Sequence, residues 1–160
     1  MTHPNEMSVV VRTVTRMTYG LIILFGFYVI MHGHLTPGGG FQGGAVVASA
    51  FALVLVAFGS AGLKGRINRH VLQSLEEVGA LAFLALGVLG LGTAFFANIF
   101  ANQPGALFGQ PVPLGSNGGP LNTAGTLPWM NWAVGLKVMT GLASIVIAML
   151  VGGKAGGEKE

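Results

Sequence analysis

Four long apolar runs constrain the fold of this chain more than any other feature. They cover approximately residues 14–31, 41–58, 78–100 and 129–151. A helix needs roughly 20 apolar residues to cross a bilayer, within a range of about 17–25. The third and fourth runs meet that length, and the first two meet it once flanking residues join the helices.

Composition argues against these runs being the buried core of a soluble protein. Charged residues make up 8% of the chain and hydrophobic residues 52%, whereas soluble domains carry about 25% charged residues. Four such helices in 160 residues would leave no polar shell to cover them. The sequence therefore predicts an all-α membrane protein, a multi-pass bundle of four transmembrane helices that forms a single membrane domain over residues 1–160.

Arg12 and Arg16 precede the uncharged part of the first run, Met17 to Met31, and a basic segment before an apolar run is also typical of a signal peptide. No small-residue cleavage site follows the run. It is followed instead by HGHLTPGGGFQGG and a second apolar run. We therefore interpret the first run as a membrane span.

The distribution of Lys and Arg predicts the orientation of the helices. Segments 32–40 and 101–128 contain neither residue, and cytoplasmic loops carry an excess of both. Both termini and the 59–77 connection are therefore predicted to be cytoplasmic, in the cell (inner) membrane. The basic residues used for this prediction are Arg12, Arg16, Lys64, Arg66, Arg69, Lys154 and Lys159.

The uncharged connection 101–128 is rich in Pro, Gly and Asn, a composition that favours an irregular loop. A freely solvated loop usually carries charge, so we expect this one to lie against a neighbouring subunit or the membrane surface. Trp129 and Trp132 follow it, and indole rings favour the membrane interface.

Missing residue types exclude several function classes. The chain has no Cys, which excludes disulfides, cysteine-ligated clusters and thiol nucleophiles. It also has no Asp, so a Ser-His-Asp triad cannot form within it. The net charge of +3 is too small for a nucleic-acid footprint. We predict no catalytic site, no cofactor, no metal site and no nucleic-acid partner.

The most specific element is HGHLTPGGGFQGG, residues 32–44. It is not a phosphate loop, because the Lys-Ser/Thr pair and the preceding strand are missing. His32 and His34 form a weak metal pair, because residues two apart point to opposite sides of a helix and no acid or Cys is nearby. Both histidines remain candidates for an ion path.

We predict that this segment forms a tight, partly unwound hairpin between the first two helices. Proline fixes the backbone, and a glycine run permits positive φ. Irregular backbone at membrane depth must be packed in protein or line water. The predicted structural residues are Pro37, Gly38, Gly39, Gly40, Phe41, Gly43 and Gly44.

Small residues recur inside the spans. Gly40, Gly44 and Ala48 follow one another at four-residue spacing, and Gly135 and Gly141 lie in the last span. Such stripes let helix backbones approach closely, although glycine is also common in membrane helices in general. We expect close packing, in part against other subunits.

Lys137 is the strongest single-residue signal. It lies about eight residues into the last run, roughly 12 Å deep at 1.5 Å per residue. It is either a functional or ion-paired residue, or it snorkels to the interface. Glu76 and Glu77 precede the third run at its cytoplasmic end, where they suit the helix dipole or serve a proton path. No acid at matching depth is expected, so a partner for Lys137 should come from another subunit or from water.

The motif R-T-V-x-R, followed by G-H-x-x-P-G-G-G-F-x-G-G, resembles the MnhB (MrpB) type of subunit found in the Mrp multisubunit sodium/proton antiporters. The resemblance is close over residues 8–60 and rests on topology beyond them. It implies a small non-catalytic subunit that packs within a heteromeric complex and lines a path for Na⁺ and H⁺. Related modules occur in energy-converting hydrogenases and ferredoxin-linked complexes, so a structural subunit of a redox-driven membrane arm is the alternative.

One departure from the antiporter pattern concerns the last span. The MnhB-type subunit of free-standing antiporters carries an acid early in this span, whereas here residues 131–138 read NWAVGLKV. Lys137 in V-G-L-K-V is more similar to the hydrogenase-associated branch. A lone small-molecule transporter is disfavoured, because four short spans without an inverted repeat offer no alternating-access plan.

Overall fold

The computed structural model describes residues 7–59, 68–90, 92, 94–112 and 120–157, with side chains described as far as Met149. Within these residues the chain forms helices and irregular segments, and the one strand-like pairing is a single bridge between Gln110 and Thr123. The helices are α1 (Val9–Met31), α2 (Gly40–Phe58), α3 (Arg69–Val88) and α4 (Leu127–Gly157).

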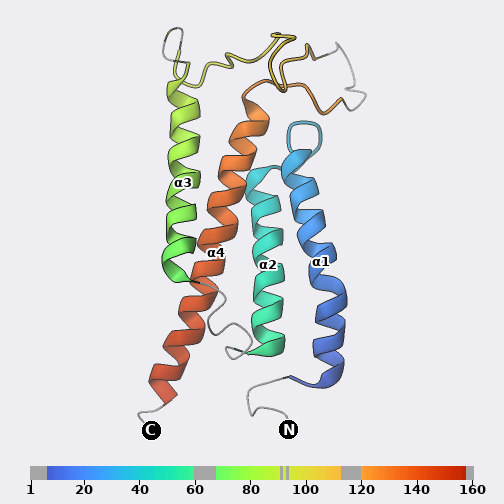
Figure 1. Ribbon diagram of the computed structural model, residues 1–160, viewed down its shortest axis with the longest axis vertical. Helices are drawn as coiled ribbons and strands as arrows, with labels where there is room; N and C mark the ends of the chain where they lie inside the picture. Colours follow the sequence, from blue (N-terminus) through green and yellow to red (C-terminus); the bar gives the residue numbers. More distant parts are fainter. Residues whose placement is uncertain (1–6, 60–67, 91, 93, 113–119, 158–160) are drawn as a thin grey trace.

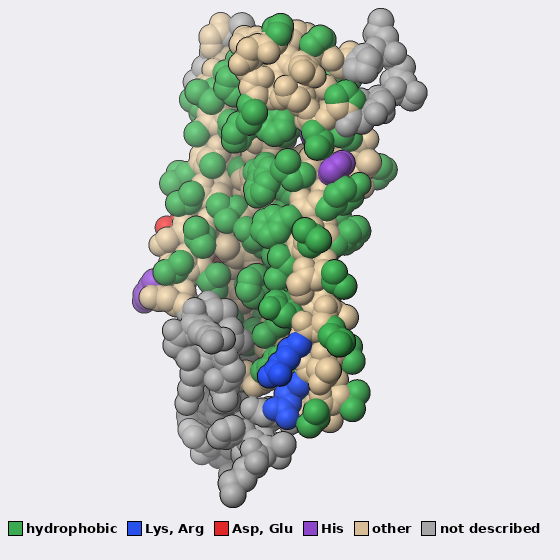
Figure 2. Space-filling view, turned by 45° about the vertical axis from the view of Figure 1, so that its right-hand side comes forward, with side chains coloured by type: hydrophobic (Ala, Val, Ile, Leu, Met, Phe, Trp, Pro, Cys, Tyr) green, Lys and Arg blue, Asp and Glu red, His purple; other side chains and the backbone are tan. Residues whose placement is uncertain are grey.

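All four helices are long and apolar enough to cross a membrane. The predicted all-α, multi-pass membrane fold is therefore confirmed. The helices alternate in direction, so α1 begins at the same end of the molecule at which α4 ends (Figure 1). Figure 2 shows hydrophobic side chains over most of the described surface in one view, with the visible Lys and Arg gathered toward that end.

The four helices lie side by side in an open row. In order across the layer they are α3, α4, α2 and α1 (Figure 1). Helix α4 packs extensively against α2 and α3, and α1 packs against α2, whereas α1 touches α4 only slightly. Only 11% of the most apolar stretch of α3 is buried in this chain. Much of the apolar surface is therefore left for lipid or other proteins.

The expected third span, 78–100, differs most from the structure. Helix α3 begins at Arg69, because the Asn68 side chain caps it by accepting a hydrogen bond from the backbone of His70 (3.0 Å). The acidic pair is thus part of the helix and does not precede it. The helix ends at Val88, and the chain then turns, reaching a positive φ of 61° at Phe96.

Helix α1 also starts earlier than the expected 14–31. Ser8 accepts a hydrogen bond from the backbone nitrogen of Val11 and caps the helix, so Arg12 and Arg16 lie in its first two turns. The Arg16 guanidinium sits 5.3 Å from the centre of the Phe58 ring, at the end of α2. Of the other basic residues used to predict the orientation, Lys64, Arg66 and Lys159 lie outside the described residues.

Glycines hold the row together, as predicted from the small-residue stripe. A Cβ added at Gly43 would lie 2.6 Å from the carbonyl oxygen of Gly26 on α1. One added at Gly44 would lie 2.8 Å from the carbonyl oxygen of Gly135 on α4. Helix α2 therefore approaches each neighbour through a different glycine. A close approach of this kind maximises dispersion contacts where the hydrophobic effect is absent.

The described parts of the segment between α3 and α4 are irregular, as the composition of residues 101–128 predicted. Asn98 ties it to the start of α4: its Oδ1 accepts hydrogen bonds from the backbone nitrogen (2.8 Å) and hydroxyl (3.1 Å) of Thr126. Its Nδ2 donates to the carbonyl of Ala124 (2.9 Å). Phe108, which is buried, packs edge-on against Trp129. These contacts join the described parts of the segment to one another and to the start of α4.

Candidate functional site

The hairpin between α1 and α2 has the backbone that the glycine run predicted. Gly38 and Gly39 have φ values of +157° and +141°, a region that side chains with a Cβ rarely adopt. Gly40 then begins α2 in direct contact with the backbone of Asn131 on α4. The hairpin is packed in protein on this side, while the Phe41 side chain points away from the chain and is 62% exposed.

The two histidines of the hairpin have different surroundings. The His32 ring stacks on Tyr28 with 4.0 Å between ring centres, and its Nδ1 lies 3.2 Å from the Tyr28 carbonyl oxygen. His34 instead reaches the segment before α4, where its Nε2 lies 3.1 Å from the Leu121 carbonyl oxygen and its ring meets Phe108 edge-on. The two rings therefore do not share a partner.

The His34 imidazole is partly buried, and its surroundings shift its pKa. Burial lowers the pKa of its imidazole below the ordinary value of 6.5, the Leu121 carbonyl opposes that effect, and neighbouring His32 lowers the pKa further. Its Nδ1 is buried without a hydrogen-bond partner within the described structure. His34 thus joins the hairpin to the segment just before α4 through Leu121.

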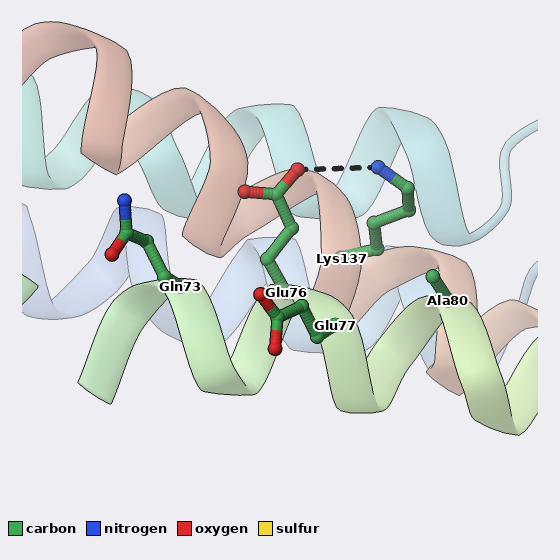
Figure 3. Close-up of a pocket in the computed structure, with 5 residues that line it drawn as sticks. All are labelled: Gln73, Glu76, Glu77, Ala80 and Lys137. Atoms are coloured by element: carbon green, nitrogen blue, oxygen red, sulfur yellow. Dashed lines mark hydrogen bonds and ion pairs between the residues drawn. The ribbon is translucent and has the colours of Figure 1, made fainter. Parts of the chain in front are cut away.

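Two of the residues predicted to serve an ion path, Lys137 and Glu76, form an ion pair between two helices. Lys137 Nζ of α4 lies 3.2 Å from Glu76 Oε1 of α3 (Figure 3). The expectation that no acid lies at the depth of Lys137 is therefore wrong. It failed because it placed the start of the third helix after the acidic pair, whereas Glu76 is seven residues, about 10 Å, into α3.

Two glycines bring the pair together. A Cβ added at Gly79, three residues after Glu76, would lie 2.8 Å from the backbone nitrogen of Lys137. One added at Gly141, four residues after Lys137, would lie 3.2 Å from Glu76 Oε1. Residues three and four apart share a helix face. Each helix thus presents one charged residue and one glycine. Gly79 leaves room for Lys137, and Gly141 leaves room for Glu76.

The pair lies near the middle of the helical layer. Gly44 of α2 contacts Gly135 of α4, and Glu76 packs on Gly141, six residues further along α4. Helices α2 and α4 run in the same direction (Figure 1). The carboxylate is therefore about ten residues, roughly 15 Å, from the Gly40 end of a 19-residue helix that spans about 28 Å.

A charge at this depth needs compensation. A central charged residue costs about 2.5–3.5 kcal/mol on insertion scales, and such residues pair with one another or mark ion pathways. The Lys137 and Glu76 side chains are 48% and 35% exposed in the isolated chain. They border an open hollow of about 440 Å³ that Gln73, Glu77 and Ala80 also line (Figure 3). This hollow is the candidate functional site.

Glu77 lies in the hollow without a partner. Its side chain is exposed, and no ion pair or hydrogen bond of its carboxylate occurs within the described part of the chain. Sequence reasoning identified the acidic pair but not the different roles of its members. The spacing to Gly79 is the signal that assigns Glu76 to the α4 side of the helix.

A family model described as a domain related to the MnhB subunit of Na⁺/H⁺ antiporters matches residues 10–144, which include all of α2, α3 and the ion pair. The chain belongs to this family. Over 107 residues it is 39% identical to a Staphylococcus aureus (strain MRSA252) protein whose name gives it as antiporter subunit mnhB2. That match covers 67% of this chain and 64% of the relative.

Two archaeal proteins are also similar to this member of the MnhB family. An uncharacterised protein of Methanocaldococcus jannaschii is 40% identical over 126 residues, which cover 78% of this chain and 45% of that protein. A chain in the structure of the membrane-bound sulfane sulfur reductase, an archaeal respiratory membrane complex, is 34% identical with a TM-score of 0.73. The match covers 93% of this chain and 60% of that one.

The match covers only part of the length of each of these relatives. It spans 45% and 64% of the two curated relatives and 60% of the matching chain in the archaeal complex.

Proposed function

We propose that this chain is a small non-catalytic membrane subunit of a multisubunit cation (Na⁺)/proton antiporter module. Membership of the MnhB family supports this assignment, as does the name of the staphylococcal relative. The open row of helices also supports it, because the two broad apolar faces need covering by lipid or by other subunits. In this proposal both termini are cytoplasmic, as the Lys and Arg distribution favours.

The strongest structural support for this proposal is the Lys137–Glu76 ion pair at mid-height of the layer of helices. An ammonium and a carboxylate facing an open polar hollow attract water and mobile ions at a depth where lipid offers neither. We therefore assign the Lys137–Glu76 pair to the border of an ion path. His32 and His34, in the hairpin at the opposite end from the termini, are candidates for its outer entrance.

A second candidate is favoured by one specific observation. The similarity to a chain of an archaeal respiratory membrane complex covers 93% of this chain. In that case the chain is a structural subunit of a redox-driven ion-pumping complex of the hydrogenase or ferredoxin-linked type. Co-purification of redox subunits with a tagged copy of this chain supports this candidate, and co-purification of antiporter subunits alone supports the first.

Variants of the ion pair test the assignment in the whole complex. An ion-path role predicts that Lys137→Ala leaves the complex assembled but lowers Na⁺-dependent proton movement in membrane vesicles. Lys137→Arg then restores transport only in part, because arginine keeps its charge but titrates much less readily.

A purely structural pair predicts a different pattern. Lys137→Ala would then reduce complex yield, because Glu76 is left uncompensated. The double variant Lys137→Met with Glu76→Gln would restore the yield, since contacting residues are coupled. Normal transport by assembled Lys137→Met complexes would remove the pair from the ion path.

A further inference from the structure

The hollow described above forms a groove between α3 and α4. This groove contains one more carboxyl group than it has ammonium groups. Its polar lining holds two carboxyl groups and one ammonium group: Glu76, Glu77 and Lys137 (Figure 3). Lys137 is engaged by Glu76 at 3.2 Å. Glu77 is left exposed at the same height, in a helix that is long and apolar enough to cross the membrane.

Glu77 belongs to a stripe that α4 does not cover. Gln73, Glu77, Ala80 and Leu84 recur at spacings of four, three and four residues, so they share one face of α3. Gln73, Glu77 and Leu84 are exposed and Ala80 is half-buried. The residue that contacts α4 most closely, Gly79, lies on another face of the helix.

The composition of this stripe is that of a protein interface. Hydrocarbon cannot satisfy an amide or a carboxylate, so Gln73 and Glu77 need polar partners at this depth. Ala80 is small, and small residues let a second helix approach closely. A phospholipid headgroup lies at the bilayer surface and cannot reach the middle of the layer.

We propose that this groove is the docking face for a transmembrane helix of another subunit, and that the docking helix presents a Lys or Arg side chain to Glu77. The inference rests on the proposed function only in requiring a multisubunit complex. A basic side chain completes the charge balance of the groove, whereas a neutral or acidic helix would leave Glu77 uncompensated. Gln73, one turn away, offers a second contact for the same head group.

The first test measures assembly of the whole complex, purified through a tag on a different subunit. Glu77→Gln is expected to lower the ratio of this chain to the tagged subunit at least fivefold, and Glu77→Asp should fall in between. Val78→Ala, an adjacent exposed position on another face of α3, serves as the control and should match the wild type. A fully assembled Glu77→Gln complex overturns the proposal, and loss of ion movement in that complex would mean that a cation or proton occupies the groove instead.

A second test keeps Glu77 in place, so that misfolding of a variant cannot decide the result. The photoreactive residue p-benzoylphenylalanine replaces Gln73 in the intact complex, and replaces Leu75 in a control at similar depth on the far side of α3. Ultraviolet light should cross-link the Gln73 probe to a membrane-spanning peptide of another subunit that contains Lys or Arg. Cross-links from Gln73 to lipid alone, or to a peptide without a basic residue, overturn the inference. If no other subunit purifies with the wild-type chain, the proposed function itself is wrong.

Discussion

Gly79 of α3 lies directly against the backbone of Lys137 of α4. A Cβ added at Gly79 would lie 2.8 Å from the backbone nitrogen of Lys137. The same Cβ would lie 2.9 Å from the carbonyl oxygen of Ala133, one turn earlier. Because both obstacles are backbone atoms, no side-chain rotation relieves them. This contact sets the relative height of the two helices, and therefore the height at which Glu76 meets Lys137.

We predict that Gly79→Ala destabilises the protein by about 1–3 kcal/mol, the usual range for overpacking a tight contact. Thermal unfolding of the solubilised protein checks this. Gly20→Ala is the matched control, because Gly20 lies in α1 with nothing within 4 Å of an added Cβ. Helix propensity alone should stabilise that variant slightly. Equal unfolding temperatures for the two variants would show that Gly79 does not set the approach of the helices.

The hairpin glycines should tolerate substitution poorly for two different reasons. Gly39→Val is expected to fail because a β-branched residue resists a φ of +141°, and Gly40→Val because α2 would be pushed off the backbone of Asn131. Each should lower the yield of assembled complex several-fold. Gly105→Val, at an open position of the 94–112 segment, is the comparison. Normal yield from either hairpin variant would make that glycine incidental.

His34 should make stability depend on pH. Since its pKa is lowered in the folded protein, the unfolded chain binds the proton first as the pH falls. The stabilisation is therefore complete above the ordinary pKa of 6.5 and declines as the pH drops below it. Unfolding temperatures at pH 7.5 and 5.5 check this. His34→Gln should show a smaller decrease between the two, and an equal decrease would assign the effect to other groups.

Cysteine labelling in intact cells or right-side-out vesicles tests the orientation, since the chain has no native Cys. Met7→Cys and Gly105→Cys place single thiols at two exposed positions, one just before α1 and one in the 94–112 segment. An impermeant thiol reagent added outside should modify the second and not the first. Labelling of Met7→Cys alone would reverse the proposed topology.

The sequence correctly predicted the features that depend on residues close together in the chain. Helix-forming apolar runs follow from composition, because lipid leaves the backbone no alternative to internal hydrogen bonds. The hairpin also follows from its own residues, since a run of glycines after Pro37 permits the positive φ found at Gly38 and Gly39. The glycine stripe of α2 was recognisable for the same reason. The sequence did not show which neighbouring helix each glycine would contact.

Helix α3 shows where sequence reasoning fell short. The prediction took the charged residues as the limit of the apolar span and so placed the start of the helix after Glu77. The Asn68 cap instead starts the helix well before the acidic residues. A charged residue such as Glu76 becomes acceptable inside a membrane helix once a partner compensates it. That partner, Lys137, lies 61 residues away along the chain.

The sequence by itself determined that the chain has four apolar helices, a glycine hairpin and a few isolated charges, because each of these depends on neighbouring residues. Only the tertiary structure decided that Glu76 meets Lys137 while Glu77 faces outward. That outcome depends on the register between α3 and α4, which the contacts at Gly79 and Gly141 fix. A shift of one residue would turn a helix by about 100° and exchange the two glutamates, so the pairing could be known only once the helices were placed side by side.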